Sequence, residues 1–187
     1  GGTVVKVVGK LADISRQRSR EQELREQAMR DVLTGIYNKA GEKLIDGMVK
    51  EKGQGLFLML DLNDFKSIND TMGHAAGDAI LTEMGRVLKG ACRENDIVAR
   101  IGGDEFVMFL PGAFDWQTGK RKIGEIQESL RTVMISAWGI RGIRASIGAA
   151  LCPEDGLDYE TLFKAADEAM YLDKEQSKNR NESREAG

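Results

Sequence analysis

The sequence predicts an α+β domain in which helices flank a mixed, largely antiparallel central sheet, and three observations support this fold class. Two apolar runs, 97–101 and 106–110, enclose Gly-Gly-Asp-Glu at 102–105, which is typical of a β-hairpin whose turn needs glycine torsions. The run 56–62 is apolar except for Asp61, as expected of a buried strand. Helical periodicity separates and follows these strands, which predicts helical connections.

The composition is that of a globular protein without a general affinity for polyanions. The 187 residues suffice for one domain and an appendage, and 41% of them are apolar. The net charge of −3 favours neither nucleic acid nor an anionic membrane, so we expect no contact of this segment with either. Two distant cysteines and one histidine leave few ligands for a zinc site, and they favour a reduced, cytoplasmic setting. No apolar run reaches the about 20 residues of a membrane span, although a longer parent protein could be anchored elsewhere.

The first 30 residues read as an appendage. Residues 3–8 resemble a short strand, and we interpret 1–13 as the end of a preceding domain. Residues 14–30 are rich in Arg, Glu and Gln with few apolar positions, which predicts an exposed helix with a narrow apolar seam. Because the polar residues Gln17 and Glu21 lie in that seam, a solvated linker and a coiled coil are equally open alternatives.

One domain is expected over 31–179, followed by a frayed tail at 180–187. Its predicted elements are, in order, a helix after the cap residue Asn38, the strand 56–62, a polar loop with a short helix at 63–78, a helix ending near Lys89, the hairpin 97–110, a helix at 116–134, a strand at 144–151 and a helix from 162 to about 174. The four long helices are predicted from apolar residues that share one face, among them Leu44, Ile45 and Val49, then Ile80, Met84 and Leu88, then Ile123, Ile126 and Leu130, and finally Leu162, Ala166 and Met170.

The strand-end carboxylates are the main chemical signal. If the end of 56–62 lies beside the hairpin turn, Asp61, Asp104 and Glu105 meet at one rim of the sheet. Carboxylates that close repel one another unless a hard divalent cation offsets their charge, and such clusters suit two-metal phosphoryl transfer. Alone, the turn sequence is equally consistent with a soluble loop, but an acid ending an apolar strand needs a partner.

Four sequence blocks resemble one known family. IGGDEF at 101–106 is the signature of the GGDEF family, and DVLTGIYN, LDLNDFKSINDTMGHAAGD and AADEAMYLDK match its other blocks in the family order. The resemblance implies diguanylate cyclase activity, in which two GTP molecules condense to cyclic di-GMP and two pyrophosphates. It also implies a fold similar to the palm of nucleotide cyclases and polymerases, which agrees with a carboxylate rim.

The resemblance implies a metal site on this rim. Asp61 and Asp104 match side chains that bind Mg²⁺, with Mn²⁺ as an alternative, and the backbone carbonyl of Leu62 completes the site. Glu105 matches a neighbouring metal or base residue. Activation is needed because a ribose 3′-OH is a poor nucleophile at neutral pH. We therefore expect Asp61, Asp104 and Glu105, together with Lys66, to be the catalytic group.

The resemblance also implies where the phosphates bind. The backbone of Asp64 and Phe65 matches the loop that holds the terminal phosphates, and Lys66 adds positive charge; free N–H groups and a lysine form a reasonable anion site. Gly102 and Gly103 are expected to let the backbone approach the nucleotide closely.

Two residues match the family's guanine readers, Asn69 and Asp78. An aspartate accepts two hydrogen bonds from the guanine edge that adenine cannot supply. Asp78 could also act as a helix N-cap next to Gly77. For His74, a loop-bracing role is the preferred interpretation.

The last helix is expected to reach the triphosphate through Lys174 and Lys178. The family usually has Gly-Arg where this chain has Ser177 and Lys178. Lysine keeps the charge but loses bidentate geometry, so weaker phosphate binding is expected. Lys39 and Asn63 are milder departures from the family pattern.

Arg93 and Asp96, spaced RxxD before the signature, match the family's inhibitory site for the product. Arginine suits guanine and phosphate contacts, and a nearby acid can orient it. Without the resemblance, such a pair would more often be a surface ion pair of little energetic value. With it, we expect feedback inhibition by cyclic di-GMP.

Since each such domain binds one GTP, the resemblance implies a homodimer. The first 30 residues then resemble the last strand of a PAS sensor domain and its signalling helix. The competing hypothesis is a catalytically weak module that binds GTP or cyclic di-GMP as a regulator, and a dimerisation scaffold is a weaker third. The presence of all the signature acids favours the enzyme.

Overall fold

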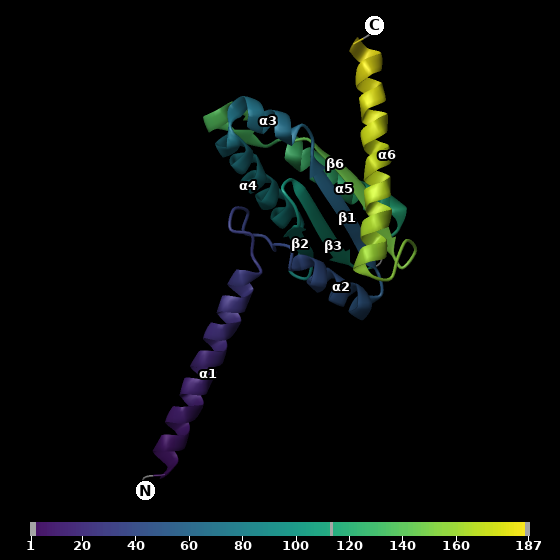
Figure 1. Ribbon diagram of the computed structural model, residues 1–187. Coiled ribbons are helices and arrows are strands. Elements are labelled where there is room, and N and C mark those ends of the chain that lie inside the picture. Colours follow the sequence, from purple (N-terminus) through teal and green to yellow (C-terminus); the bar gives the residue numbers. More distant parts are fainter. Residues whose placement is uncertain (1–2, 113, 186–187) are drawn as a thin grey trace. The chain divides into compact units, whose positions relative to one another are not determined.

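The computed structural model describes residues 3–112 and 114–185, and the side chains of 16–112, 114–172 and 174 (Figure 1). The chain divides after Arg30 into two compact units. Within the described ranges, no helix combines the length and apolar character needed to cross a membrane.

The N-terminal unit is one helix, α1 (Thr3–Ala28). The strand expected at 3–8 is therefore wrong, whereas the helix expected from residue 14 is present. An isolated strand leaves its backbone groups without partners, while a helix satisfies them within the segment. The side chains of 16–28 are exposed, and Gln17 donates a hydrogen bond to Glu21 at 3.4 Å, one turn along. The proposed remnant of a preceding domain, 1–13, has no described side chains and stays a prediction.

The second unit is built on a four-stranded sheet with the order β2-β3-β1-β6. Its strands are β1 (Gly55–Leu62), β2 (Ile97–Arg100), β3 (Glu105–Pro111) and β6 (Ala145–Cys152). All three pairings in this sheet are antiparallel. Parallel pairing occurs as an isolated bridge between Tyr37 and Ala99. The predicted fold class, helices around a largely antiparallel sheet, is confirmed.

Helices cover both faces of this sheet, which explains why β1 is apolar almost throughout (Figure 1). Phe57 and Met59 belong to the core shared with α2 (Gly41–Lys52) and α6 (Tyr159–Glu185). Leu58 and Leu60 belong to the core shared with α4 (His74–Ala91) and α5 (Trp116–Arg131). Alternate residues of one strand thus supply two cores, as the period of a strand requires.

Several predicted boundaries need correction. The segment 63–78 contains α3 (Phe65–Met72), but α4 already begins at His74. The helix predicted to end at residue 134 ends at Arg131. A small unpredicted hairpin follows, formed by β4 (Met134–Ile135) and β5 (Ile140–Arg141) around the 3-10 turn η1 (Ser136–Trp138). Helix α6 continues well past residue 174.

Candidate functional site

The antiparallel register of β1 and β3 brings the strand-end acids together. Asp61 lies directly opposite Glu105, and the N–H of Leu62 donates to the carbonyl of Asp104 at 3.3 Å. Asp61, Leu62, Asp104 and Glu105 therefore share one rim of the sheet, because the pairing leaves no freedom to slide either strand end away.

The electrostatics of the rim reflect crowding of like charges. Burial and then the Asp61 carboxylate raise the pKa of Asp104. Burial, Asp61, Asp104 and Asp167 raise the pKa of Glu105. Asp167, on α6, is an acid that sequence reasoning left without a role although it lies inside a family block. The rim therefore favours a proton or a cation.

Lys174 of α6 supplies one positive charge to the rim. Its Nζ donates to Oδ1 of Asp61 at 2.9 Å, and both side chains are partly buried. The lysine expected to reach a triphosphate thus lies at the carboxylate rim. Lys178 lies outside the residues whose side chains are described, and its role stays a prediction.

The donor chemistry of the rim fits a hard divalent cation. Carboxylate oxygens of Asp61 and Asp104 and the carbonyl of Leu62 are the ligands that such ions prefer. The raised pKa values of Asp104 and Glu105 reflect burial first and repulsion from neighbouring acids second. Within the described residues, no three His, Cys, Asp or Glu side chains converge as a ready metal site. Because Oδ1 of Asp61 accepts from Lys174, a cation bound there would compete with this lysine for Asp61.

The signature turn is braced by Arg100, at the end of β2. Its Nη2 and Nε donate to the carbonyl of Gly103 at 2.7 and 3.1 Å, and Nη1 lies 3.3 Å from Asp31. Hydrogen bonds from Thr34 also fix Asp31. The sequence analysis did not identify this brace. Its signal was the position of the two charged residues, since Asp31 begins the block DVLTGIYN and Arg100 directly precedes IGGDEF.

The two glycines of the turn have different surroundings. A side chain on Gly102 would collide with the Glu105 carboxylate, so glycine leaves room for that acid. Nothing surrounds Gly103 within 4 Å of the place a Cβ would occupy. Neither glycine has a positive φ. The expectation that the turn needs glycine torsions is therefore wrong, and space for Glu105 is the physical reason for Gly102.

The predicted phosphate loop follows the rim directly. Asp64 has a φ of 60°, in the left-handed region, and α3 begins at Phe65. Asn63 is fixed through its N–H, which donates to the carbonyl of Arg144 at 3.0 Å, and its side chain accepts from Ser146 at 2.8 Å. Lys66 is exposed in the first turn of α3. The loop is thus held close to the acids.

The predicted guanine readers lie on neighbouring helices. Asn69 is on α3 and Asp78 is on α4, where its carboxylate is exposed. Because α4 begins at His74, Asp78 lies inside the helix, and the alternative role as an N-cap is wrong. His74 is exposed at the start of α4, and its suggested bracing role stays untested.

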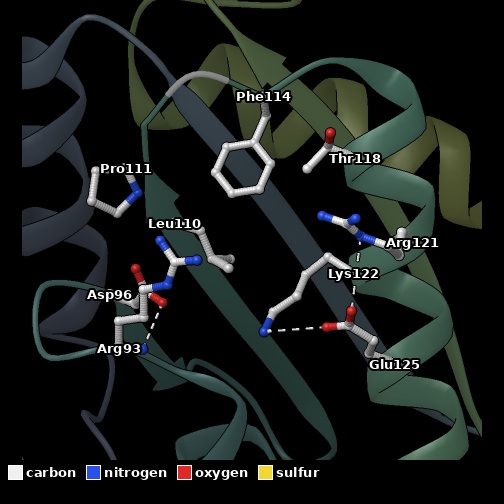
Figure 2. Close-up of a pocket in the computed structure, with 9 residues that line it drawn as sticks. All are labelled: Arg93, Asp96, Leu110, Pro111, Phe114, Thr118, Arg121, Lys122 and Glu125. Carbon is white, nitrogen blue, oxygen red and sulfur yellow. Dashed lines mark hydrogen bonds and ion pairs between the residues drawn. The ribbon is translucent and has the colours of Figure 1, made fainter.

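The predicted inhibitory residues, Arg93 and Asp96, line a pocket away from the carboxylate rim. Figure 2 shows the guanidinium of Arg93 beside Leu110, facing Arg121 and Lys122 of α5, with the Phe114 ring above the space between them. The backbone N–H of Arg93 donates to Oδ2 of Asp96 at 2.7 Å, which closes the turn before β2.

Helix α5 adds Arg121, Lys122 and Glu125 to this pocket. Lys122 donates to the carbonyl of Ala91 at 2.7 Å and lies 3.9 Å from Glu125. Sequence reasoning missed these residues because they are polar positions on a helix that the fold brings back beside Arg93. With Arg93 and Phe114 included, the pocket has three cationic side chains and an aromatic ring beside the acids Asp96 and Glu125. The cations and the ring suit the phosphates and the base of a nucleotide.

Comparisons with known proteins agree with this geometry. A family model described as "Diguanylate cyclase, GGDEF domain" matches residues 28–180. The chain is 32% identical over 165 residues to the diguanylate cyclase DgcS of Shewanella oneidensis, covering 84% of this chain and 53% of that protein. It is 34% identical over 161 residues to the diguanylate cyclase TpbB of Pseudomonas aeruginosa, covering 83% and 37%.

A solved structure of the coiled coil and GGDEF domain of DgcB from Caulobacter crescentus, in complex with c-di-GMP, is similar with a TM-score of 0.78. The identity is 25%, and the match covers 92% of this chain and 94% of that one. The chain spans only 21%, 24% and 53% of three curated relatives.

Proposed function

The chain belongs to the GGDEF diguanylate cyclase domain family, and from this membership we propose that it condenses two GTP molecules into cyclic di-GMP and two pyrophosphates. The observation that supports this most strongly is the strand register that sets Asp61 opposite Glu105, with Asp104 beside them. Curated relatives named diguanylate cyclase support the same activity.

In each half of the reaction, the 3′-oxygen of one GTP forms a bond to the α-phosphorus of the other, and the bond to pyrophosphate breaks. The proton leaves to a base, for which Glu105 is the candidate. Asp61, Asp104, Glu105 and the carbonyl of Leu62 would hold Mg²⁺, or Mn²⁺ in its place. Such an ion, when bound, supplies charge neutralisation and an acidified hydroxyl.

The remaining residues position the substrate. The backbone of Asp64 and Phe65 and the side chain of Lys66 would bind the terminal phosphates, with Lys174 and Lys178 approaching from α6. Lys174 already lies at the rim, so its ammonium group could bind a phosphate by replacing its hydrogen bond to Asp61.

Asn69 and Asp78 would read the guanine base across the α3–α4 junction. Because a wrong base leaves their polar groups unpaired, the pair would disfavour ATP.

The two GTP molecules imply two domains facing each other as a homodimer. On α1 the side chains of 16–28 are exposed, which suits pairing of this part of the helix with a second copy. The coiled coil named in the similar DgcB structure supports this arrangement.

We also propose feedback inhibition at the pocket of Arg93. Arg93, Arg121 and Lys122 would contact the phosphates of cyclic di-GMP, and Phe114 would stack on a base. Asp96 would orient Arg93 or accept from guanine. The GGDEF domains solved with c-di-GMP support binding of this ligand in the family.

The test is incubation of the purified protein with GTP and Mg²⁺ over a range of protein concentrations, with products identified by chromatography and mass. We expect cyclic di-GMP, a specific rate that rises with protein concentration, and loss of product in Asp104→Ala. Absence of product at concentrations where the protein is dimeric would overturn the proposal. Binding of GTP or cyclic di-GMP by such an inactive dimer would instead identify a regulatory module.

A further inference from the structure

Gly77 occupies a point of close contact between helices α3 and α4, which lie side by side (Figure 1). It is buried, and a Cβ placed on it would collide with Oδ1 of Asn69. The same Cβ would lie 3.0 Å from Cγ of Asn69 and 3.2 Å from a ring carbon of Phe65. Any other residue at 77 would therefore have to move the end of the Asn69 side chain.

Glycine at 77 is required for space and not for backbone freedom. Its φ is not among the positive values found in the structure, so an alanine could adopt the same helical backbone. Gly90, on the same helix, has nothing within 4 Å of its Cβ position. The constraint at Gly77 therefore comes from side chains of α3, first Asn69 and then Phe65, and not from α4 itself.

We infer that Gly77 is a specificity-determining positioning residue that holds the Asn69 amide where it can act together with Asp78. This inference depends on the proposed GTP substrate. Asp78 follows Gly77 directly, and the main-chain carbonyl of Asn69 accepts from Gly73 at 2.9 Å. The backbone of Asn69 is thus fixed, so an added methyl group at 77 displaces mainly its side chain. The base contact suffers while the phosphate contacts stay.

The test is a double-mutant cycle on nucleotide affinity, measured by calorimetry with non-hydrolysable analogues of GTP and ATP. Gly77→Ala is expected to weaken GTP-analogue binding about five- to tenfold, the equivalent of one hydrogen bond, and to leave ATP-analogue binding nearly unchanged. In the Asn69→Ala background the colliding amide is gone, and the Phe65 ring carbon at 3.2 Å is the close neighbour that remains among the atoms near this Cβ. There, Gly77→Ala should change affinity less than about twofold, because the two changes act on one group.

Gly90→Ala controls for the added helix propensity and should leave both affinities unchanged. Thermal unfolding of each variant shows whether the fold is kept. The inference would be overturned if Gly77→Ala weakened GTP-analogue binding equally in the parent and in the Asn69→Ala background. It would also be overturned if the single variant Gly77→Ala kept the preference of the parent protein for the GTP analogue over the ATP analogue. Failure of the unmodified protein to prefer the GTP analogue would instead contradict the proposed substrate.

Discussion

Nζ of Lys174 lies 2.9 Å from Oδ1 of Asp61, although the two residues are 113 positions apart. The contact joins the last helix to the end of the central strand at the rim where Asp104 and Glu105 also lie. Only 34% of the lysine side chain and 19% of the aspartate side chain are exposed, so solvent screens the pair only in part. Lys174 therefore offsets part of the negative charge at the rim, as does Arg100, whose charge also acts on Asp104.

Lys174→Met is expected to weaken binding of a non-hydrolysable GTP analogue by about tenfold or more, because a charge-assisted contact to phosphate is lost. Calorimetry in the presence of Mg²⁺ measures the change. Lys164→Met, an exposed position on the same helix, is the matched control and should bind normally. Equal affinities in the two variants would contradict the assigned role of Lys174.

The pH dependence of stability should report the crowded acids. The pKa of Glu105 is raised from its ordinary value of 4.5 by burial and by Asp61, Asp104 and Asp167. The folded state therefore holds this proton more tightly than the unfolded state. The contribution of Glu105 to the free energy of unfolding is therefore greatest below its unfolded-state pKa, and it is lost as pH rises through its folded-state pKa.

Glu105→Gln removes this effect. In metal-free protein at pH 8, the variant should be more stable than the parent by roughly 0.2 to 1 kcal/mol, the size of a like-charge pair across two strands. The difference should shrink toward pH 4, as measured by denaturant unfolding. Glu154→Gln, exposed in the turn after β6, should show no such trend. A less stable Glu105→Gln at pH 8 would contradict the predicted repulsion.

Product inhibition is expected to depend on Arg93. Arg93→Ala should raise the concentration of cyclic di-GMP needed for half-inhibition by at least about tenfold, because the pocket loses one of its three cations. Initial rates at fixed GTP and increasing product measure the effect. Arg86→Ala, an exposed arginine of α4 paired with Glu83, should be inhibited like the parent protein. Unchanged inhibition of Arg93→Ala would rule out this pocket.

Local sequence patterns predicted the structural features that lie within a single helix, strand or sequence block. The hairpin, the strand 56–62 and the three acids were predictable because apolar runs and a turn place them at strand ends. The two alternating cores of β1 follow from its being buried on both faces.

Contacts between segments that are distant in the sequence were not predictable. Neither the pair of Lys174 with Asp61 nor the approach of α5 to Arg93 has a local pattern, since each depends on how helices pack against the sheet. The strand expected at 3–8 failed because valines alone cannot form a strand without a neighbour. The end of α5 and the hairpin β4–β5 were missed because such short elements carry little periodicity.

The brace of the signature turn by Arg100 provides the last prediction. Its guanidinium donates twice to the carbonyl of Gly103 and also pairs with Asp31. Only 16% of this side chain is exposed. Lysine would keep the charge near Asp31, but it has no planar fork with which to bind both partners.

Arg100→Lys should therefore loosen the turn that carries Asp104. We expect kcat to fall about tenfold with little change in KM for GTP, and stability to fall by roughly 1 to 2 kcal/mol, about one or two hydrogen bonds. Steady-state kinetics and denaturant unfolding measure the two effects. Arg86→Lys, which alters an exposed ion pair, should change neither. If Arg100→Lys lost stability but kept its kcat, the brace would serve the fold alone, because a turn that positions Asp104 for the reaction cannot loosen without slowing it.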